Sequence, residues 1–226
     1  ATPRSTTMPA GTGPVADRQE SPHAHQVLRV PGTSGDWLLS DLGADRVLRY
    51  SAPGGEAVPV LVDSSELPAG SGPRHMAWIH DSLLVAGELD SQLHVLSPAG
   101  DRLGYRGAVS TRDRESPPRE ANFPSHVEVS PNQEFAFVAN RGRNSIAVFD
   151  VSQVGGGGMP VLVREVPSGG EWPRHFVFHE GHLYVANQRS NSIAVFAADR
   201  DRGLIQELTQ LVSTGSPMCL VVSADE

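Results

Sequence analysis

Arginines and histidines recur at matching positions of a repeated sequence pattern, which opens with Pro-Arg-His or a close variant. Arg74 and Arg174 stand in two of these openings, and Arg141 follows the Ala-Asn that ends part of another copy. Guanidinium groups bind phosphate and carboxylate groups in a bidentate fashion. Because the chain has a formal net charge of -8, a concentration of cations on it suggests a site for a small anionic ligand. The alternative is that these arginines are surface residues paired with Asp or Glu.

The pattern repeats at the spacing of β-propeller blades. The residues that open the first strand of each copy lie at intervals of 50, 51, 49 and 44 residues; they are His25, His75, His126, His175 and Cys219. Such intervals, with about four short strands in each, are typical of propeller blades. The 23 Gly and 18 Pro residues also favour many turns between short strands. We therefore predict an all-β chain of four-stranded antiparallel blades, with a sandwich of hairpin pairs as the alternative.

The predicted blades cover residues 21–70, 71–120, 121–170 and 171–214, and a closing strand follows at 216–223. Residues 1–20 are rich in Thr, Pro, Gly and Ala, so they are predicted to be a flexible tail or linker from a missing N-terminal part. The last copy holds a single strand. The chain is therefore expected to be the C-terminal four to five blades of a larger ring.

In an up-and-down blade, the start of the first strand and the end of the second lie at the same face. First strands line the central channel, so the polar residues at these two places should ring its mouth. They are His23, His25, Asp41, Arg74, His75, Glu88, His126, Asn140, Arg141, Arg174, His175, Asn187 and Gln188. The in-register histidines and the asparagines could instead join blades, whereas His23 and Glu88 break the repeat and are stronger functional candidates.

Other polar residues have structural interpretations. Asn, Asp and Ser at one turn before the third strand are expected to bond their own backbone; these residues are Asp45, Ser91, Asn144 and Asn191. Cys219 is expected to be a buried, inert thiol. Four histidines outside the repeat position are expected to be surface or turn residues: His80, His94, His179 and His182.

Composition argues against several classes of function. A sequence pI of about 5.6 makes nucleic acid an unexpected partner, and no apolar run is long enough to cross a bilayer. A single cysteine allows no disulfide within the chain and no thiolate cluster. We expect no metal, because no His, Asp and Glu set has a recognisable ligand spacing and the converging groups are largely cationic.

Several motifs together resemble the lactonase family of seven-bladed β-propellers, which includes bacterial 6-phosphogluconolactonases and fungal 3-carboxymuconate cyclases. These motifs are Ser21-Pro22-His23-Ala24-His25, Asp41-Leu42-Gly43-Ala44-Asp45, Gly72-Pro73-Arg74-His75, Gly87-Glu88-Leu89-Asp90-Ser91, Ala139-Asn140-Arg141-Gly142 and Pro173-Arg174-His175-Phe176. The resemblance covers about residues 17–222 and implies that about two blades precede residue 1. Two features depart from the family: Gly87 stands where Asn is usual, and 155–158 is a glycine tract, expected to be a loop after a third strand.

The resemblance implies a catalytic set of His25 (with His23 as the other choice), Arg74, Glu88 and Arg141. Substrate contacts are expected from His23, His75, His126, Asn140, Arg174, His175 and Asn187. The implied reaction is hydrolysis of a small anionic lactone such as 6-phosphogluconolactone, without metal or cofactor. His25 or Glu88 would be the general base, and Arg74 and Arg141 would bind the anionic group or the oxyanion.

Two alternatives stay open. One is a carboxymuconate-type cycloisomerase, and the other is a non-catalytic propeller that serves as a binding scaffold. A cytoplasmic location is expected, with neither nucleic acid nor membrane as partner. The sequence leaves the oligomeric state undetermined.

Overall fold

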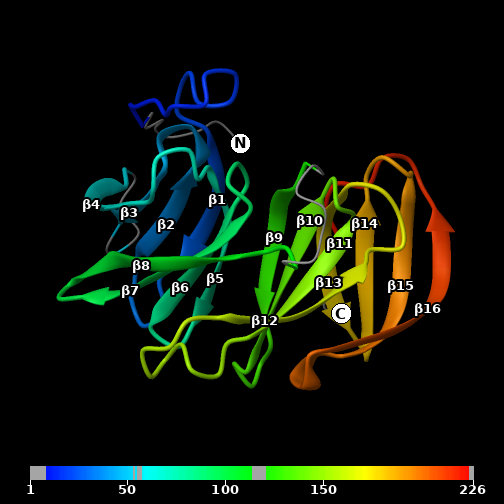
Figure 1. The fold of residues 1–226 in the computed structure, drawn as a ribbon. Coiled ribbons are helices and arrows are strands. Elements are labelled where there is room, and N and C mark those ends of the chain that lie inside the picture. The colour runs from blue at the N-terminus through cyan, green and yellow to red at the C-terminus, as the bar shows by residue number, and fades with distance from the viewer. Residues whose placement is uncertain (1–8, 53, 55–57, 114–120, 224–226) are drawn as a thin grey trace.

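The computed structural model describes residues 9–52, 54, 58–113 and 121–223, and within them sixteen strands form four antiparallel sheets (Figure 1). The first sheet comprises β1 (Ala24–Arg29), β2 (Asp36–Asp41), β3 (Arg46–Ser51) and β4 (Val60–Glu66). The second comprises β5 (Pro73–Ile79), β6 (Ser82–Gly87), β7 (Gln92–Ala99) and β8 (Arg102–Ser110). The third comprises β9 (Phe123–Val129), β10 (Phe135–Arg141), β11 (Ser145–Asp150) and β12 (Val161–Pro167). The fourth comprises β13 (Pro173–His179), β14 (His182–Asn187), β15 (Ser192–Asp199) and β16 (Leu204–Ser213).

The strands of each sheet follow one another in chain order, so the predicted all-β architecture of four-stranded antiparallel blades is confirmed. Short 3-10 turns are also present, among them η1 (Leu42–Ala44) and η3 (Arg200–Arg202). No helix in the described part of the chain has the length and hydropathy needed to span a membrane. Each sheet lies within one of the four predicted repeat units.

Apolar side chains fill the spaces between neighbouring sheets. Between the second and third sheets, Leu84 and Val95 pack with Val138 and Phe149, and all four are fully buried. Similar clusters join the first sheet to the second and the third to the fourth. Burial of apolar surface between sheets therefore holds the inner strands β1, β5, β9 and β13 side by side.

The predicted turn residues all adopt the left-handed backbone conformation, with φ of 51° at Asp45, 63° at Ser91, 58° at Asn144 and 52° at Asn191. Their side chains also reach the start of the next unit. Asn144 Oδ1 accepts a hydrogen bond from the backbone N–H of Trp172 at 2.8 Å. Asn191 Oδ1 accepts one from Ser216 at 3.0 Å. These turns therefore hold neighbouring units together at the end of the strands where the candidate site residues lie.

Residues 9–20 are the described part of the predicted tail, and one of their side chains packs against the first sheet. Gln19 is fully buried, and its amide donates to Leu42 O at 2.8 Å and to Asp45 Oδ1 at 2.7 Å. A Cβ at Gly13 would lie 2.4 Å from Gln19 Oε1, so glycine is needed there. Composition averages over the whole segment. It does not show that a single side chain in it, that of Gln19, forms hydrogen bonds with several buried polar groups. Residues 1–8 lie outside the described part.

Residues 216–223, predicted as a closing strand, form no strand in the structure. A strand needs a neighbour to bond with, and the fourth sheet presents β16 and β13 at its edges while this segment pairs with neither. The segment is nevertheless placed, because Leu220 N–H approaches His175 Nδ1 at 3.4 Å. Cys219 is exposed, so the prediction of a buried thiol is wrong. A closing role for the segment stays a prediction.

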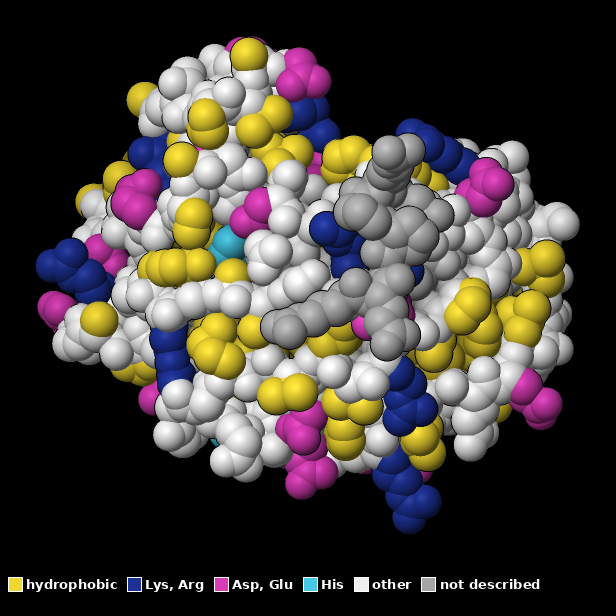
Figure 2. All heavy atoms as spheres, in the orientation of Figure 1, with side chains coloured by type: hydrophobic (Ala, Val, Ile, Leu, Met, Phe, Trp, Pro, Cys, Tyr) yellow, Lys and Arg dark blue, Asp and Glu magenta, His cyan; other side chains and the backbone are white. Residues whose placement is uncertain are grey.

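The surface carries both signs of charge. On the face shown in Figure 2, the basic and acidic side chains are interspersed with apolar ones and do not gather into one basic patch. Outside the residues drawn in grey, this face shows no continuous cationic track for a nucleic-acid backbone.

Candidate functional site

Each inner strand has an irregular register close to its first residues. The shifts lie between Ala24 and Gln26 in β1, between Pro73 and Met76 in β5, and between Pro173 and His175 in β13. The pairing of β9 with β10 shifts at the same end. A β-bulge breaks the alternation of side chains and re-aims them. Because of the bulge in β5, the side chains of the adjacent residues Arg74 and His75 can belong to two different clusters that lie side by side.

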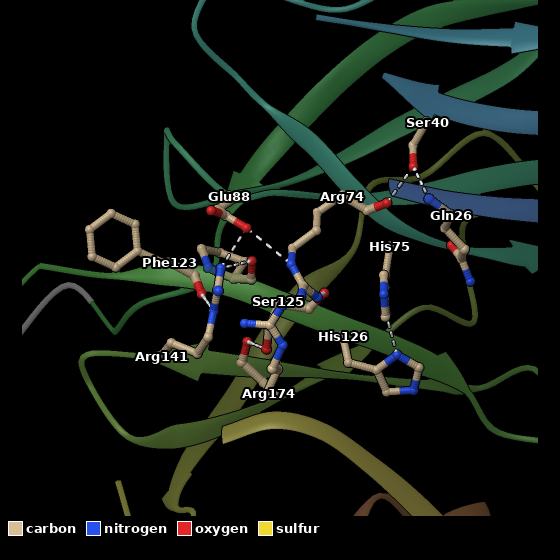
Figure 3. Close-up of polar contacts among 12 residues, drawn as sticks. Gln26, Ser40, Arg74, His75, Glu88, Phe123, Ser125, His126, Arg141 and Arg174 are labelled. Atoms are coloured by element: carbon tan, nitrogen blue, oxygen red, sulfur yellow. Dashed lines mark hydrogen bonds and ion pairs between the residues drawn. The ribbon is translucent and has the colours of Figure 1, made fainter. Parts of the chain in front are cut away.

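The first cluster surrounds Glu88, which follows the last residue of β6 and is only 3% exposed. Its Oε2 lies 3.0 Å from Arg74 Nε and 2.6 Å from Arg141 Nη2. Its Oε1 pairs with Arg18 Nη2. Figure 3 shows Arg74 and Arg141 converging on the carboxylate. Three predicted catalytic residues from two sheets thus form one buried ion-pair network, joined by an arginine from the N-terminal segment.

Backbone carbonyls hold the two buried guanidinium groups in place. Arg74 Nη1 donates to Ser125 O at the start of β9, and Arg141 Nε donates to Phe123 O at 3.1 Å. The Trp172 ring centroid lies 5.5 Å from the Arg141 guanidinium carbon. Donors fixed in this way need little reorganisation when an anion or oxyanion forms beside them.

The charges of this network favour ionised side chains. Burial raises the pKa of Glu88, but Arg141, Arg18 and Arg74 together outweigh burial and lower it, so the carboxylate is ionised at neutral pH. Burial and the neighbouring Arg141 lower the pKa of Arg74 to about 9, which still leaves the group protonated at pH 7.

The second cluster consists of the four in-register histidines, which meet beside the arginines. Ring centroids are 5.2 Å apart for His25 and His75, 5.0 Å for His75 and His126, and 4.0 Å for His126 and His175. The Nδ1 atoms of His75 and His126 are 2.7 Å apart, so one donates a proton to the other. Burial lowers the pKa of all four rings. For His25 the pKa falls to about 4, with Arg74 as the next cause after burial.

Neutral imidazoles therefore lie next to cations at pH 7. Among the described residues, no group of three or more His, Cys, Asp or Glu side chains has the arrangement needed to hold a metal ion. His25 Nδ1 is buried and has no hydrogen-bond partner in the described part of the chain, so its lone pair is unpaired when the other nitrogen carries the proton.

The structure separates the two candidate histidines of the first sheet. His23 has a side chain 40% exposed, with Nε2 3.5 Å from Glu20 Oε1. His25 instead contacts His75, and its pKa is affected by Arg74 and Glu88. Of the two, His25 is the one that belongs to the charged cluster.

Asn140 and Asn187 are fully buried and join blades. Asn140 Nδ2 donates to Thr111 O at 2.8 Å, and Asn187 Nδ2 donates to Ser168 O at 2.9 Å. Both acceptors follow the outermost strand of the preceding sheet. Since neither amide has an exposed atom, these contacts support the structural alternative and give no support to the predicted substrate contacts.

Arg174 lies at the edge of the network. Its Nη1 donates to Gln188 Oε1 at 3.3 Å, and its charge contributes to lowering the pKa of Arg141 and His25. In Figure 3 its side chain lies near Ser125, beside Arg74 and Arg141. It thus adds a further cation beside the network.

The glycine at position 87 makes room for a buried histidine. A Cβ at Gly87 would lie 2.6 Å from His94 Nε2 and 2.3 Å from Asp90 Oδ1. His94 is 1% exposed, and its Nε2 lies 3.0 Å from Asp90 Oδ2. The prediction that His94 is a surface or turn residue is therefore wrong, because the missing side chain at 87 opens an interior space that its ring fills.

Sequence reasoning missed Arg18, because it lies in the segment interpreted as a tail. The signal that could have revealed it was the resemblance itself, which begins near residue 17 and so includes this arginine. Its side chain is 39% exposed, against 4% for Glu88, its partner.

A well-formed hollow lies away from this network. A cavity of about 340 Å³ opens between the first and second sheets, at the end of the strands opposite the arginine network. Trp78, His80 and Arg49 line it, and none of the predicted site residues does. Charge and geometry, and not hollow volume, therefore locate the candidate site.

Comparisons with known proteins agree with this architecture. The model of a family described as lactonase, 7-bladed beta-propeller, matches residues 1–222. A 6-phosphogluconolactonase of Bacillus subtilis is 31% identical over 227 residues, covering 96% of this chain and 62% of that protein. A solved structure of a Lactobacillus plantarum protein is 26% identical with a TM-score of 0.85, over 95% of this chain and 62% of that one.

A periplasmic gluconolactonase of Pseudomonas aeruginosa is 29% identical with a TM-score of 0.77, over 88% of this chain and 56% of that one. The chain spans 56% to 62% of the length of the curated relatives at the head of this comparison.

Proposed function

Because the chain belongs to the lactonase family of seven-bladed β-propellers, we propose that its arginine network and His25 open a small anionic sugar lactone such as 6-phosphogluconolactone by hydrolysis. The observation that carries this proposal is the buried carboxylate of Glu88 within 3.0 Å of Arg74 and 2.6 Å of Arg141. The names of the relatives from Bacillus subtilis and Pseudomonas aeruginosa support the reaction class.

In the proposed reaction, water attacks the lactone carbonyl carbon while an imidazole takes its proton. His25 suits this role better than Glu88, because both carboxylate oxygens of Glu88 are already paired with arginines. A pKa of about 4 keeps His25 neutral at pH 7. A bound anion near Arg74 offsets the cationic charge that depresses this pKa and raises it toward the range suited to a general base.

Arg74 and Arg141 then stabilise the oxyanion that forms on the carbonyl oxygen. The bond between the carbonyl carbon and the ring oxygen breaks, the ring oxygen receives the proton from His25, and the product is the open-chain hydroxy acid. Glu88 orients the two guanidinium groups and keeps them together despite their mutual repulsion.

The test is the rate of acid production from 6-phosphogluconolactone by the purified protein, corrected for spontaneous hydrolysis in buffer. Arg141→Lys keeps the charge but loses the planar fork, so we expect kcat/KM to fall by about 10²-fold or more. Glu88→Gln, which is isosteric, should cause a comparable loss. Arg202→Gln is a matched control, because this side chain is 78% exposed and follows β15 at the opposite end of the strands.

Rates within about twofold of the parent protein for both Arg141→Lys and Glu88→Gln, with unchanged circular dichroism, would contradict the proposal. The same assay with a carboxymuconate substrate decides between hydrolysis and cycloisomerisation.

A further inference from the structure

We propose that Arg18 is a specificity-determining residue that binds the phosphate of a phosphorylated lactone, an inference that rests on the proposed function. Its position on the N-terminal segment sets it apart from the other arginines of the network, which lie in or beside the sheets. Three observations carry it: an anchored loop, a surplus of positive charge and the exposure of this one guanidinium.

The loop that carries Arg18 is anchored to the first sheet. The backbone N–H groups of Arg18 and Gln19 donate to Val15 O at 2.9 and 2.8 Å, which closes a tight turn. The buried amide of Gln19 anchors this turn to Leu42 and Asp45 of the first sheet. The guanidinium of Arg18 is therefore brought to Glu88 by a fixed element.

The network has more positive than negative charge. Three arginines, Arg18, Arg74 and Arg141, pair with the single carboxylate of Glu88, which leaves a surplus of two positive charges. A phosphate monoester carries a charge of about -1.5 to -2 at pH 7. A phosphorylated substrate therefore balances this surplus, whereas a neutral sugar lactone does not.

Arg18 is the member of the three that solvent can reach. Its side chain is 39% exposed, against 2% for Arg74 and 6% for Arg141. Both buried arginines also donate to backbone carbonyls, of Ser125 and Phe123 respectively. An anion arriving from solvent thus meets Arg18 first. When Arg18 turns from Glu88 to the phosphate, the carboxylate keeps its two buried partners and the inner network stays assembled.

The experiment compares 6-phosphogluconolactone with unphosphorylated glucono-1,5-lactone in the purified protein and in Arg18→Gln. We expect kcat/KM for the phosphorylated substrate to fall by about 10- to 100-fold, mostly through KM, and kcat/KM for the unphosphorylated substrate to fall much less. Arg18→Lys, which keeps the charge, should recover part of the loss. Arg202→Gln should change neither substrate.

A second variant separates binding from loop placement. Gln19→Ala removes the anchor but keeps the guanidinium, so it should lower the preference for the phosphorylated lactone in the same direction. Equal losses on both lactones in Arg18→Gln, or no loss on either, would overturn the inference.

If neither lactone is turned over, the proposed function fails, and calorimetric titration with 6-phosphogluconate still tests Arg18. Weaker binding by Arg18→Gln than by the parent protein supports its role in holding the phosphate. Equal binding, or none by the parent protein, contradicts it.

Discussion

The proposed mechanism depends on a single residue, His25, being neutral at a pH at which an ordinary histidine is partly charged. Burial, followed by the charge of Arg74, lowers its pKa to about 4, and Arg141 and Arg174 act in the same direction while Glu88 opposes them. A base must be unprotonated to accept a proton, so activity requires a pH above this value.

We therefore predict that kcat/KM for the anionic lactone stays level as pH falls from 7 to about 5 and declines only near pH 4. His25→Asn should lower the rate by about 10² to 10⁴-fold across this range. The measurement is a pH–rate profile of the parent protein and the variant, corrected for the hydrolysis of the lactone in buffer. A decline centred near pH 6.5, or a His25→Asn variant with full activity, would show that this ring is not the base.

Some residues of the candidate site could be predicted from the sequence, and others could not. Glu88 could be identified because it departs from the repeat, and Arg74 and Arg141 because they concentrate positive charge on an acidic chain. The sequence could not show that Asn140 and Asn187 are sealed between blades, since exposure depends on packing that no single sequence displays. Arg18 was missed because its loop is held by Gln19, a contact with residues 23 and 26 positions away.

In the second sheet, a residue of one strand fills the space left by a missing side chain in the neighbouring strand. β6 ends in Gly87, and β7 supplies His94, whose ring fills the space that a side chain at position 87 would need. In the two following sheets an asparagine stands at this place, Asn140 next to the end of β10 and Asn187 at the end of β14.

We predict that Gly87→Asn destabilises the protein by about 1–3 kcal/mol, since the new side chain collides with His94 and Asp90. Adding His94→Ala removes the obstacle, so the double variant should be more stable than the sum of the two single changes predicts. Urea unfolding of the four proteins measures this coupling. Strict additivity would mean that the two positions do not compete for one space.

The elements themselves followed from sequence more completely than the site did. Alternating short strands and the turn residues at Asn144 and Asn191 predicted each sheet, because period-two patterning and left-handed turns are local properties. The segment 216–223 has the sequence of a strand but forms none here, because a strand depends on a partner that its own residues do not specify.

At the scale of the whole molecule, the four converging histidines make stability depend on pH. Each has a lowered pKa in the folded protein, so between about pH 6.5 and about pH 4 the unfolded chain binds more protons than the folded one. Stability from this source is fully present above about pH 6.5 and is lost as pH falls below it.

We predict that the free energy of unfolding decreases from pH 7 to pH 5, by up to about 1.4 kcal/mol per pH unit for each proton taken up. His75→Gln should make this dependence shallower, because it removes one of the four titrating rings. His179→Gln, a change at a surface position, should leave it unaltered. Urea unfolding midpoints at three pH values measure this dependence in the parent protein and in both variants. Parallel pH dependence in all three proteins would count against the histidine cluster as its source.

The four sheets have the packing and order of propeller blades, and we propose that they form part of the seven-bladed ring of their family. The network lies where inner strands of neighbouring sheets begin, so its arginines come from different blades and the ring itself brings them together. A structure of the protein with bound 6-phosphogluconate, the product of the proposed reaction, tests whether the arginine network holds the ligand. We expect anionic groups of the ligand within about 3 Å of the guanidinium nitrogens of Arg74, Arg141 or Arg18. A ligand seated in the cavity lined by Trp78 and Arg49, or no ligand at saturating concentration, would contradict the account.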